Sequence, residues 1–122
     1  MTKLTGRLLA SATVLWTTAA MAADDELVLY CSPQIEWCQL MVEAFERETG
    51  IDVAMTRKSS GETFAQIKAE AANPRGDVWW GGTGDPHLQA AEEGLTVEYR
   101  SPRLEELRDW ALQQAEQSGY RT

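Results

Sequence analysis

The chain has 122 residues and a formal net charge of −8, with 19 acidic and 11 basic side chains. This acidic balance argues against nucleic acid and anionic membrane surfaces as partners, because both select basic protein surfaces. The length allows one small domain.

Residues 1–22 are predicted to be a signal peptide. Lys3 and Arg7 form a basic start, an apolar stretch follows, and Ala20-Met21-Ala22 matches a small-x-small cleavage site. The apolar stretch is short for a membrane span and contains several Ser and Thr residues, which disfavours the alternative of an uncleaved anchor. Cleavage at this site would leave residues 23–122, with a net charge of about −10, in the bacterial periplasm.

The rest of the chain alternates strand and helix signals. Short apolar runs predict three strands, and the stretches that follow them have helical periodicity. Repeated β–loop–α units of this kind indicate the α/β class with a parallel sheet and right-handed crossovers. Strands are expected at 27–30, 51–55 and 77–80, a weak strand or extended segment at 95–99, and helices at 34–49, 60–73, 86–93 and 104–118, the last broken near Asp109.

Local patterns predict where the helices begin and which face the first one buries. Ser32-Pro33 and Asp85-Pro86 are each expected to supply a cap and a first helical residue. Ser59 and Glu62 have the spacing of a capping box, and Gly50 is expected to end the first helix. The predicted buried face of that helix comprises Cys38, Met41, Val42 and Phe45.

Cys31 and Cys38, the only cysteines, are predicted to form a disulfide in the oxidising periplasm. Cys31 would end a strand and Cys38 would lie in the second turn of the next helix. The bond requires their Cα atoms to lie within ~7 Å. Two free, partly buried thiols are the alternative. The spacing is not C-x-x-C, so a thioredoxin-type redox role is not expected.

Three loops are expected to meet at the carboxyl edge of the sheet and to form a ligand site. Each loop leads into a helix N-terminus, where free N–H groups attract anions or ligand oxygens. The Ser and Thr hydroxyls in these loops can donate or accept hydrogen bonds. The candidate ligand-binding residues are Ser32, Ser59, Ser60, Gly61, Trp80, Gly81, Gly82 and Thr83.

Each candidate also has a structural interpretation. Ser32 and Ser59 alone would serve as helix caps, and the glycines alone would permit a tight turn. Side chains alternate between the two faces of a strand, so Trp79 is expected in the core and Trp80 nearer the edge. His87, the single histidine, is expected to be a solvated surface side chain rather than a base or metal ligand.

Four segments together resemble the start of a type II periplasmic solute-binding protein. They are residues 27–33, the A-F-E-x-x-T-G-I-x-V pattern in 43–53, Ser60-Gly61-Glu62, and the D-V-W-W-G-G run at 77–82. The subgroup is the ferric-iron type of ABC importer receptors, which includes binders of phosphonates and other small anions. The resemblance covers nearly all of residues 26–122. It implies two α/β lobes that close on a ligand through a hinge.

The resemblance implies a periplasmic binding component rather than an enzyme. Its cargo would be ferric iron or a small anion, its partner an ABC permease of the inner membrane, and it would be a monomer without a resident cofactor. Family members are much longer, so residues 23–122 are expected to be a truncated first lobe without the second lobe. The metal ligands are unknown, because the paired tyrosines of ferric binders belong to the part that is missing.

Several alternatives stay open at this point. A phosphonate-type anion fits the loops at least as well as iron, because the first loop, Cys31 to Gln34, starts with no His or Glu. The isolated chain is expected to bind weakly or not at all, since half of the cleft would be missing. A secreted hydrolase using Ser32 or Ser60 with His87 lacks a G-x-S-x-G elbow. A complete disulfide-stabilised interaction domain should melt cooperatively, whereas a severed lobe should aggregate.

Overall fold

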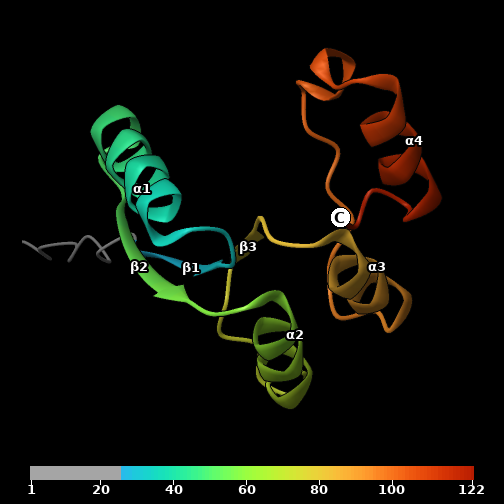
Figure 1. Cartoon of the computed structure of the whole chain (residues 1–122), viewed down its shortest axis with the longest axis horizontal. Helices are drawn as coiled ribbons and strands as arrows, with labels where there is room; N and C mark the ends of the chain where they lie inside the picture. The colour runs from blue at the N-terminus through green and yellow to red at the C-terminus, as the bar shows by residue number, and fades with distance from the viewer. Residues whose placement is uncertain (1–25) are drawn as a thin grey trace, which may run out of the picture.

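The computed structural model describes residues 26–122, and the predicted signal peptide lies outside them. These residues form a mixed α/β fold with a three-stranded parallel sheet (Figure 1). The predicted fold class is therefore confirmed. The elements are β1 (Glu26–Cys31), α1 (Ile35–Thr49), β2 (Asp52–Arg57), α2 (Ser60–Ala69), β3 (Val78–Trp80), α3 (Gly84–Glu92), the 3-10 helix η1 (Leu104–Glu106) and α4 (Asp109–Gln117).

β1 is the central strand of the sheet, whose order is β2-β1-β3. Its last residue, Cys31, is aligned with Arg57 at the end of β2 and with Trp80 at the end of β3. The three strands therefore stop at the same level. The loops that follow them begin along one edge of the sheet, as the sequence predicts.

Helices cover both faces of β1, because alternate side chains point to opposite faces of a strand. Leu29 and Cys31 form a small buried cluster with Cys38 of α1. On the other face, the Tyr30 hydroxyl donates to Glu70, directly after α2. In Figure 1, α1 and α2 accordingly lie on opposite sides of the strands.

Met41 is not part of the core, although the sequence places it there. Its side chain is 47% exposed, while Cys38 is fully buried and Val42 packs partly against the core. The disulfide joins Cys38 to the end of β1, and Met41, three positions later, lies on the neighbouring exposed stripe of α1.

Two of the predicted helix signals are present in the structure. Gly50 adopts a left-handed conformation with φ of 72° directly after α1 and ends that helix. Ser59 and Glu62 form the complete capping box at the start of α2. α2 ends at Ala69, before the predicted end near Asn73.

The two predicted starts at X-Pro pairs are wrong. α1 is capped by Gln34, because the backbone N–H of Ser32 still donates to the carbonyl of Trp80 and continues the strand. α3 follows Thr83 and begins at Gly84, so Asp85 and Pro86 lie within its first turn.

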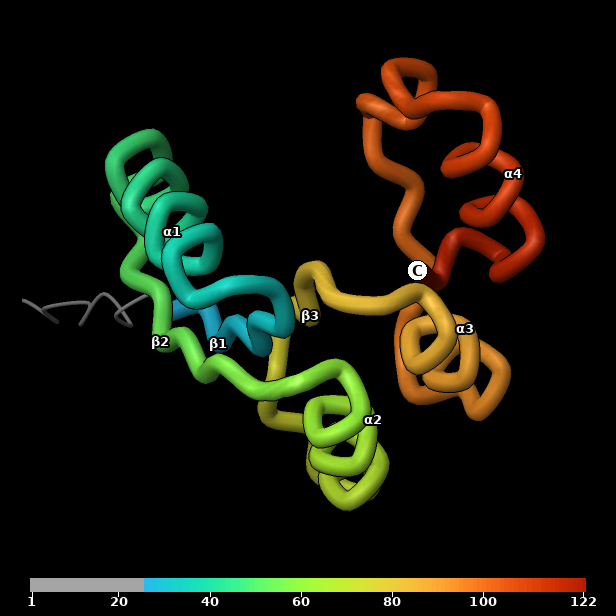
Figure 2. The backbone as a smooth tube through the Cα atoms, in the orientation of Figure 1, coloured from blue at the N-terminus to red at the C-terminus, as the bar shows by residue number. Residues whose placement is uncertain are grey.

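The C-terminal segment contains no strand at residues 95–99. Instead, the Tyr99 N–H donates to the carbonyl of Tyr120. The helix predicted from 104 is divided into η1 and α4, and α4 begins at Asp109, so the predicted break is confirmed. Figure 2 shows this segment beside α3 and away from the sheet. None of the helices in residues 26–122 has both the length and the apolar character that crossing a membrane requires.

Candidate functional site

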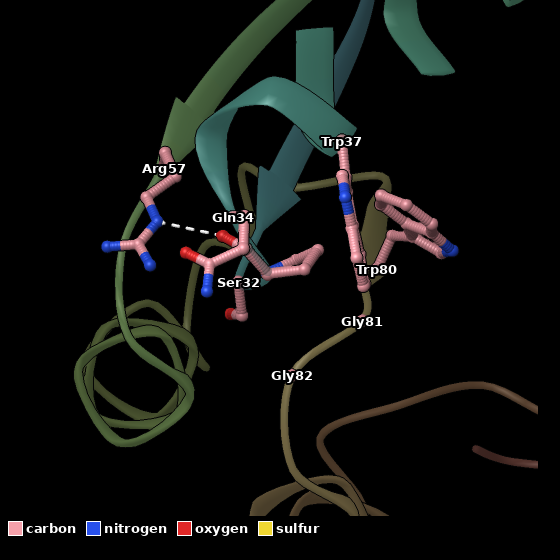
Figure 3. Close-up of a pocket in the computed structure, with 8 residues that line it drawn as sticks. Ser32, Gln34, Trp37, Arg57, Trp80, Gly81 and Gly82 are labelled. Carbon is pink, nitrogen blue, oxygen red and sulfur yellow. Dashed lines mark hydrogen bonds between the residues drawn. The ribbon is translucent and has the colours of Figure 1, made fainter. Parts of the chain in front are cut away.

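A shallow pocket lies at the edge of the sheet where the three strands end. Its volume is about 470 Å³. Figure 3 shows Trp37 and Trp80 on one flank and Arg57 on the other, beyond Gln34. The lining residues are Ser32, Pro33, Gln34, Trp37, Arg57, Trp80, Gly81 and Gly82.

The predicted site residues divide into two groups. Ser32, Trp80, Gly81 and Gly82 line the pocket, whereas Ser59, Ser60, Gly61 and Thr83 do not. The hydroxyl of Ser59 donates to a carboxylate oxygen of Glu62 at 2.6 Å within the capping box. The hydroxyl of Ser60 accepts from the Thr83 N–H at 3.0 Å. The second of these hydrogen bonds joins the start of α2 to the loop after β3.

The hydroxyl of Ser32 also forms hydrogen bonds within the protein. Its side chain is buried, and Oγ accepts from the indole N–H of Trp79 at 2.9 Å. The same oxygen lies 3.2 Å from the hydroxyl of Thr63, and either group can donate. Ser32 therefore links β3 and α2 beneath the pocket.

Gly81 and Gly82 line the pocket with backbone atoms alone, because glycine has no side chain. Their φ angles are 72° and 94°, in the region that favours glycine. A Cβ atom on Gly82 would collide with the Ser60 hydroxyl and lie 2.8 Å from the Ser32 Cβ. Within residues 26–122 the N–H groups of both glycines have no hydrogen-bond partner, so they are available to a ligand oxygen.

His87 is not the solvated side chain that the sequence predicts. Its ring stacks on Trp79 with centroids 3.6 Å apart, and Nε2 lies 2.9 Å from the carbonyl oxygen of Gly81. Trp79 thus lies between Ser32 and His87, outside the buried Leu29–Cys31–Cys38 cluster. Trp80 both packs against that cluster and lines the pocket, so its predicted place near the edge is correct.

Arg57, Gln34 and Trp37 line the pocket but are absent from the predicted site. β2 extends two residues beyond its predicted end, which brings Arg57 to the edge of the sheet. Its Nε donates to the carbonyl of Pro33 at 3.0 Å, and its terminal nitrogens have no partner within residues 26–122. The position of a basic residue so close to the carboxyl end of a predicted strand was the signal that could have revealed Arg57.

The disulfide between Cys31 and Cys38 is present, with Cα atoms 6.1 Å apart. Both residues are fully buried. The bond joins the end of β1 to α1, and the loop between the two cysteines passes along the pocket. In the described part of the chain, no group of three or more His, Cys, Asp or Glu residues could hold a metal ion.

Two carboxylates away from the pocket have shifted pKa values. The hydrogen bonds from the side chain and backbone of Ser59 lower the pKa of Glu62. The hydroxyl of Tyr30 donates to Glu70 at 2.7 Å, which lowers the pKa of Glu70. Burial, together with the bond to Glu70, raises the pKa of Tyr30. These groups stabilise the scaffold behind the site.

Comparison with known proteins assigns the family. The model described as "Bacterial extracellular solute-binding protein" matches residues 27–107. An uncharacterized protein of Haemophilus influenzae is 39% identical over 98 residues. That match covers 80% of this chain and 28% of the relative, so the chain spans less than a third of the relative's length.

Solved structures of periplasmic binding proteins share the fold. AfuA from Actinobacillus pleuropneumoniae is 43% identical with a TM-score of 0.67, covering 69% of this chain and 26% of AfuA. The periplasmic binding protein P5PA is 36% identical with a TM-score of 0.72, covering 77% and 30% of the two chains. Iron-bound HitA from Pseudomonas aeruginosa is 27% identical with a TM-score of 0.62, covering 67% and 26%.

The matched region includes all three strands and the loops that form the pocket. The relatives have sequences and folds that agree with the resemblance found in the sequence. The chain therefore belongs to the family of bacterial extracellular solute-binding proteins and has the fold of part of a type II periplasmic binding protein.

Proposed function

We propose that this chain supplies part of the first lobe of a periplasmic receptor that binds a solute for an ABC importer. Family membership supports a binding role rather than an enzymatic one. In this proposal, residues 1–22 direct export and are removed, and the pocket at the sheet edge forms one wall of the ligand cleft. A second lobe, outside this chain, would close the cleft and present the solute to a permease.

We propose that the solute is a small anion carrying a phosphate or phosphonate group, rather than ferric iron. The observation that supports this choice is Arg57, whose guanidinium group lies at the pocket with its terminal nitrogens free of other partners in residues 26–122. A guanidinium group binds phosphate oxygens in a two-point geometry. Ferric iron is a hard cation that needs oxygen ligands and would be repelled by this charge.

The relatives also favour a phosphate-bearing solute over ferric iron. AfuA, at 43% identity, was solved with fructose-6-phosphate bound, whereas iron-bound HitA is only 27% identical. In this chain, Arg57 and the free N–H groups of Gly81 and Gly82 would bind the anionic oxygens. Trp37 and Trp80 would pack against the carbon skeleton of the solute, because aromatic faces offer a large apolar surface.

The test is a titration of residues 23–122 with fructose 6-phosphate, fructose and ferric citrate, followed by amide chemical shifts. Fructose 6-phosphate should shift the amides of Gly81 and Gly82, while fructose should not. Binding should be weak, because only one wall of the cleft is present. Shifts at the pocket caused by ferric citrate and not by the sugar phosphate would contradict the proposal.

Variants make the test specific. Arg57→Gln should weaken binding of fructose 6-phosphate by roughly tenfold to a hundredfold, the value of a hydrogen-bonded charge. Arg57→Lys should bind at an intermediate level, because it keeps the charge and loses the two-point geometry. Arg47→Gln, in the last turn of α1 and outside the pocket, removes the same charge and should bind like the wild type.

A further inference from the structure

The disulfide encloses a large share of the proposed solute site. Cys31 and Cys38 are seven positions apart, and the segment between them contributes four of the eight pocket-lining residues. They are Ser32, Pro33, Gln34 and Trp37. The bond is therefore placed to control the shape of one wall of the pocket.

Few other contacts hold the second half of this segment. Gln34 caps α1 without any side-chain hydrogen bond. Trp37 is 62% exposed and Ile35 is 39% exposed, so packing fixes neither of them firmly. Cys38 is the only buried residue of α1, and it is buried where it joins β1. The first turn of α1 is thus tied to the sheet mainly through the disulfide.

The remainder of α1 has its own anchors. Val42 packs partly against the core, and the carboxylate of Glu46 accepts from the Val53 N–H of β2 at 2.9 Å. These contacts lie one or more turns beyond the disulfide. Loss of the bond should therefore loosen residues 34–38 while Ser32, Pro33, β1, β2 and the later turns of α1 stay in place.

We infer that Cys31 and Cys38 are positioning residues of the solute pocket: their disulfide holds Gln34 and Trp37 in the geometry that receives the ligand. The inference rests on the proposed function of the pocket. A loose loop must be ordered when the ligand binds, and the entropy lost in ordering it weakens affinity. The protein with the bond formed is then the form that binds, and reduction lowers affinity without unfolding the sheet.

The experiment compares the wild type, Cys31→Ala/Cys38→Ala and Met41→Ala, each as residues 23–122. Met41 is a matched control, because it is exposed on α1 just beyond the disulfide and does not line the pocket. Two quantities are measured: the dissociation constant for fructose 6-phosphate, and amide hydrogen exchange of residues 34–38 against residues 53–57 of β2. Trp37→Ala, with the disulfide intact, reports how much affinity the indole itself supplies.

The expected result is at least a tenfold loss of affinity in the double variant, with faster exchange confined to residues 34–38. Met41→Ala should match the wild type in both measurements. Unchanged exchange in residues 34–38 would overturn the inference, as would loss of protection throughout β2, which would make the bond a determinant of global stability. If the wild type does not bind fructose 6-phosphate, the proposed ligand fails, and the exchange pattern still decides whether the disulfide positions the loop.

Discussion

Gly82 is the most tightly constrained residue of the site. Its backbone lies between Ser32, in the loop after β1, and Ser60, the first residue of α2. Its φ of 94° is strained for any residue with a Cβ atom. The three loops can therefore approach one another only because this position has no side chain.

Gly82→Ala should lower the free energy of unfolding by roughly 1–3 kcal/mol, the cost of a strained backbone conformation. The substitution should also push the loop after β3 away from Ser32 and Ser60. Urea unfolding followed by circular dichroism measures the change. Gly61→Ala is the control, because a Cβ atom there meets nothing within 4 Å. Equal stability of the two variants would show that the loops do not pack as described.

The sequence identified the edge of the sheet as the site but did not reveal the internal hydrogen bonds of several of its side chains. Ser32, Ser59 and Ser60 have the chemistry of ligand-binding residues, yet each hydroxyl is used within the scaffold. The partner of Ser59 is local and was predicted, whereas the partners of Ser32 and Ser60 lie on other elements and only the three-dimensional structure gives them. The position of His87 was also missed. Its ring stacks on Trp79 of β3, and only the folded Gly81–Gly82 turn brings these two side chains together.

At the scale of the elements, α2 is held at its two ends by different polar contacts. The capping box of Ser59 and Glu62 fixes its start, and Glu70 at its C-terminal cap accepts from Tyr30 of β1. Both contacts involve a carboxylate with a lowered pKa. The position of α2, and with it the buried Thr63 beneath Ser32, should therefore depend on pH.

Ser59→Ala should lower the free energy of unfolding at neutral pH by about 1 kcal/mol, the usual value of a helix cap. The pKa of Glu62 is lowered by the cap, so its stabilisation is present above the unfolded value of about 4.3 and lost as pH falls through the lowered folded value. The variant should therefore lose less stability than the wild type on acidification. Denaturant titrations across the acid range measure this difference, and parallel pH profiles would contradict it.

Glu70→Gln should bring the pKa of Tyr30 closer to its ordinary value of about 10, because the hydrogen bond to the carboxylate and its negative charge help to raise that pKa. A raised pKa means that Tyr30 stabilises the fold below its ordinary value and that this contribution is lost as pH rises through the folded value. Phenolate absorbance during an alkaline titration measures the shift. The same titration of the wild type provides the reference.

The ends of the helices were predictable where the signal is purely local. The Ser59–Glu62 box and the left-handed Gly50 depend on residues only a few positions apart. The Ser32-Pro33 pair failed because a tertiary contact competes with capping: the Ser32 N–H is still paired with Trp80 of another strand. The parallel sheet itself was predictable, since its apolar runs and crossover helices form a repeating pattern.

At the scale of the whole molecule, the described residues leave apolar surface uncovered. Trp37, Leu40 and Met41 form an exposed stripe on α1, with exposed fractions of 62%, 65% and 47%. Within residues 26–122, β3 pairs only with β1 and so has one unpaired edge. An exposed apolar stripe and an open strand edge both favour association between molecules.

We expect residues 23–122 to self-associate with increasing concentration. Leu40→Gln combined with Met41→Gln should reduce this association and change the free energy of unfolding by no more than about 0.5 kcal/mol, because both side chains are exposed. Analytical ultracentrifugation over a concentration series measures the effect. Val97→Gln, at an exposed apolar position outside the stripe, should leave association unchanged. Monomeric wild-type protein at all concentrations would contradict this prediction.

Among the strands of residues 26–122, β1 is synthesised first, yet it occupies the central position of the sheet. β1 needs β2 on one side and β3 on the other, and β3 is completed only at Trp80. Pairing between such distant segments is slow to form. A growing polypeptide that has not reached Gly82 has neither a finished sheet nor a complete pocket, so the binding surface should arise only once the turn after β3 has been synthesised.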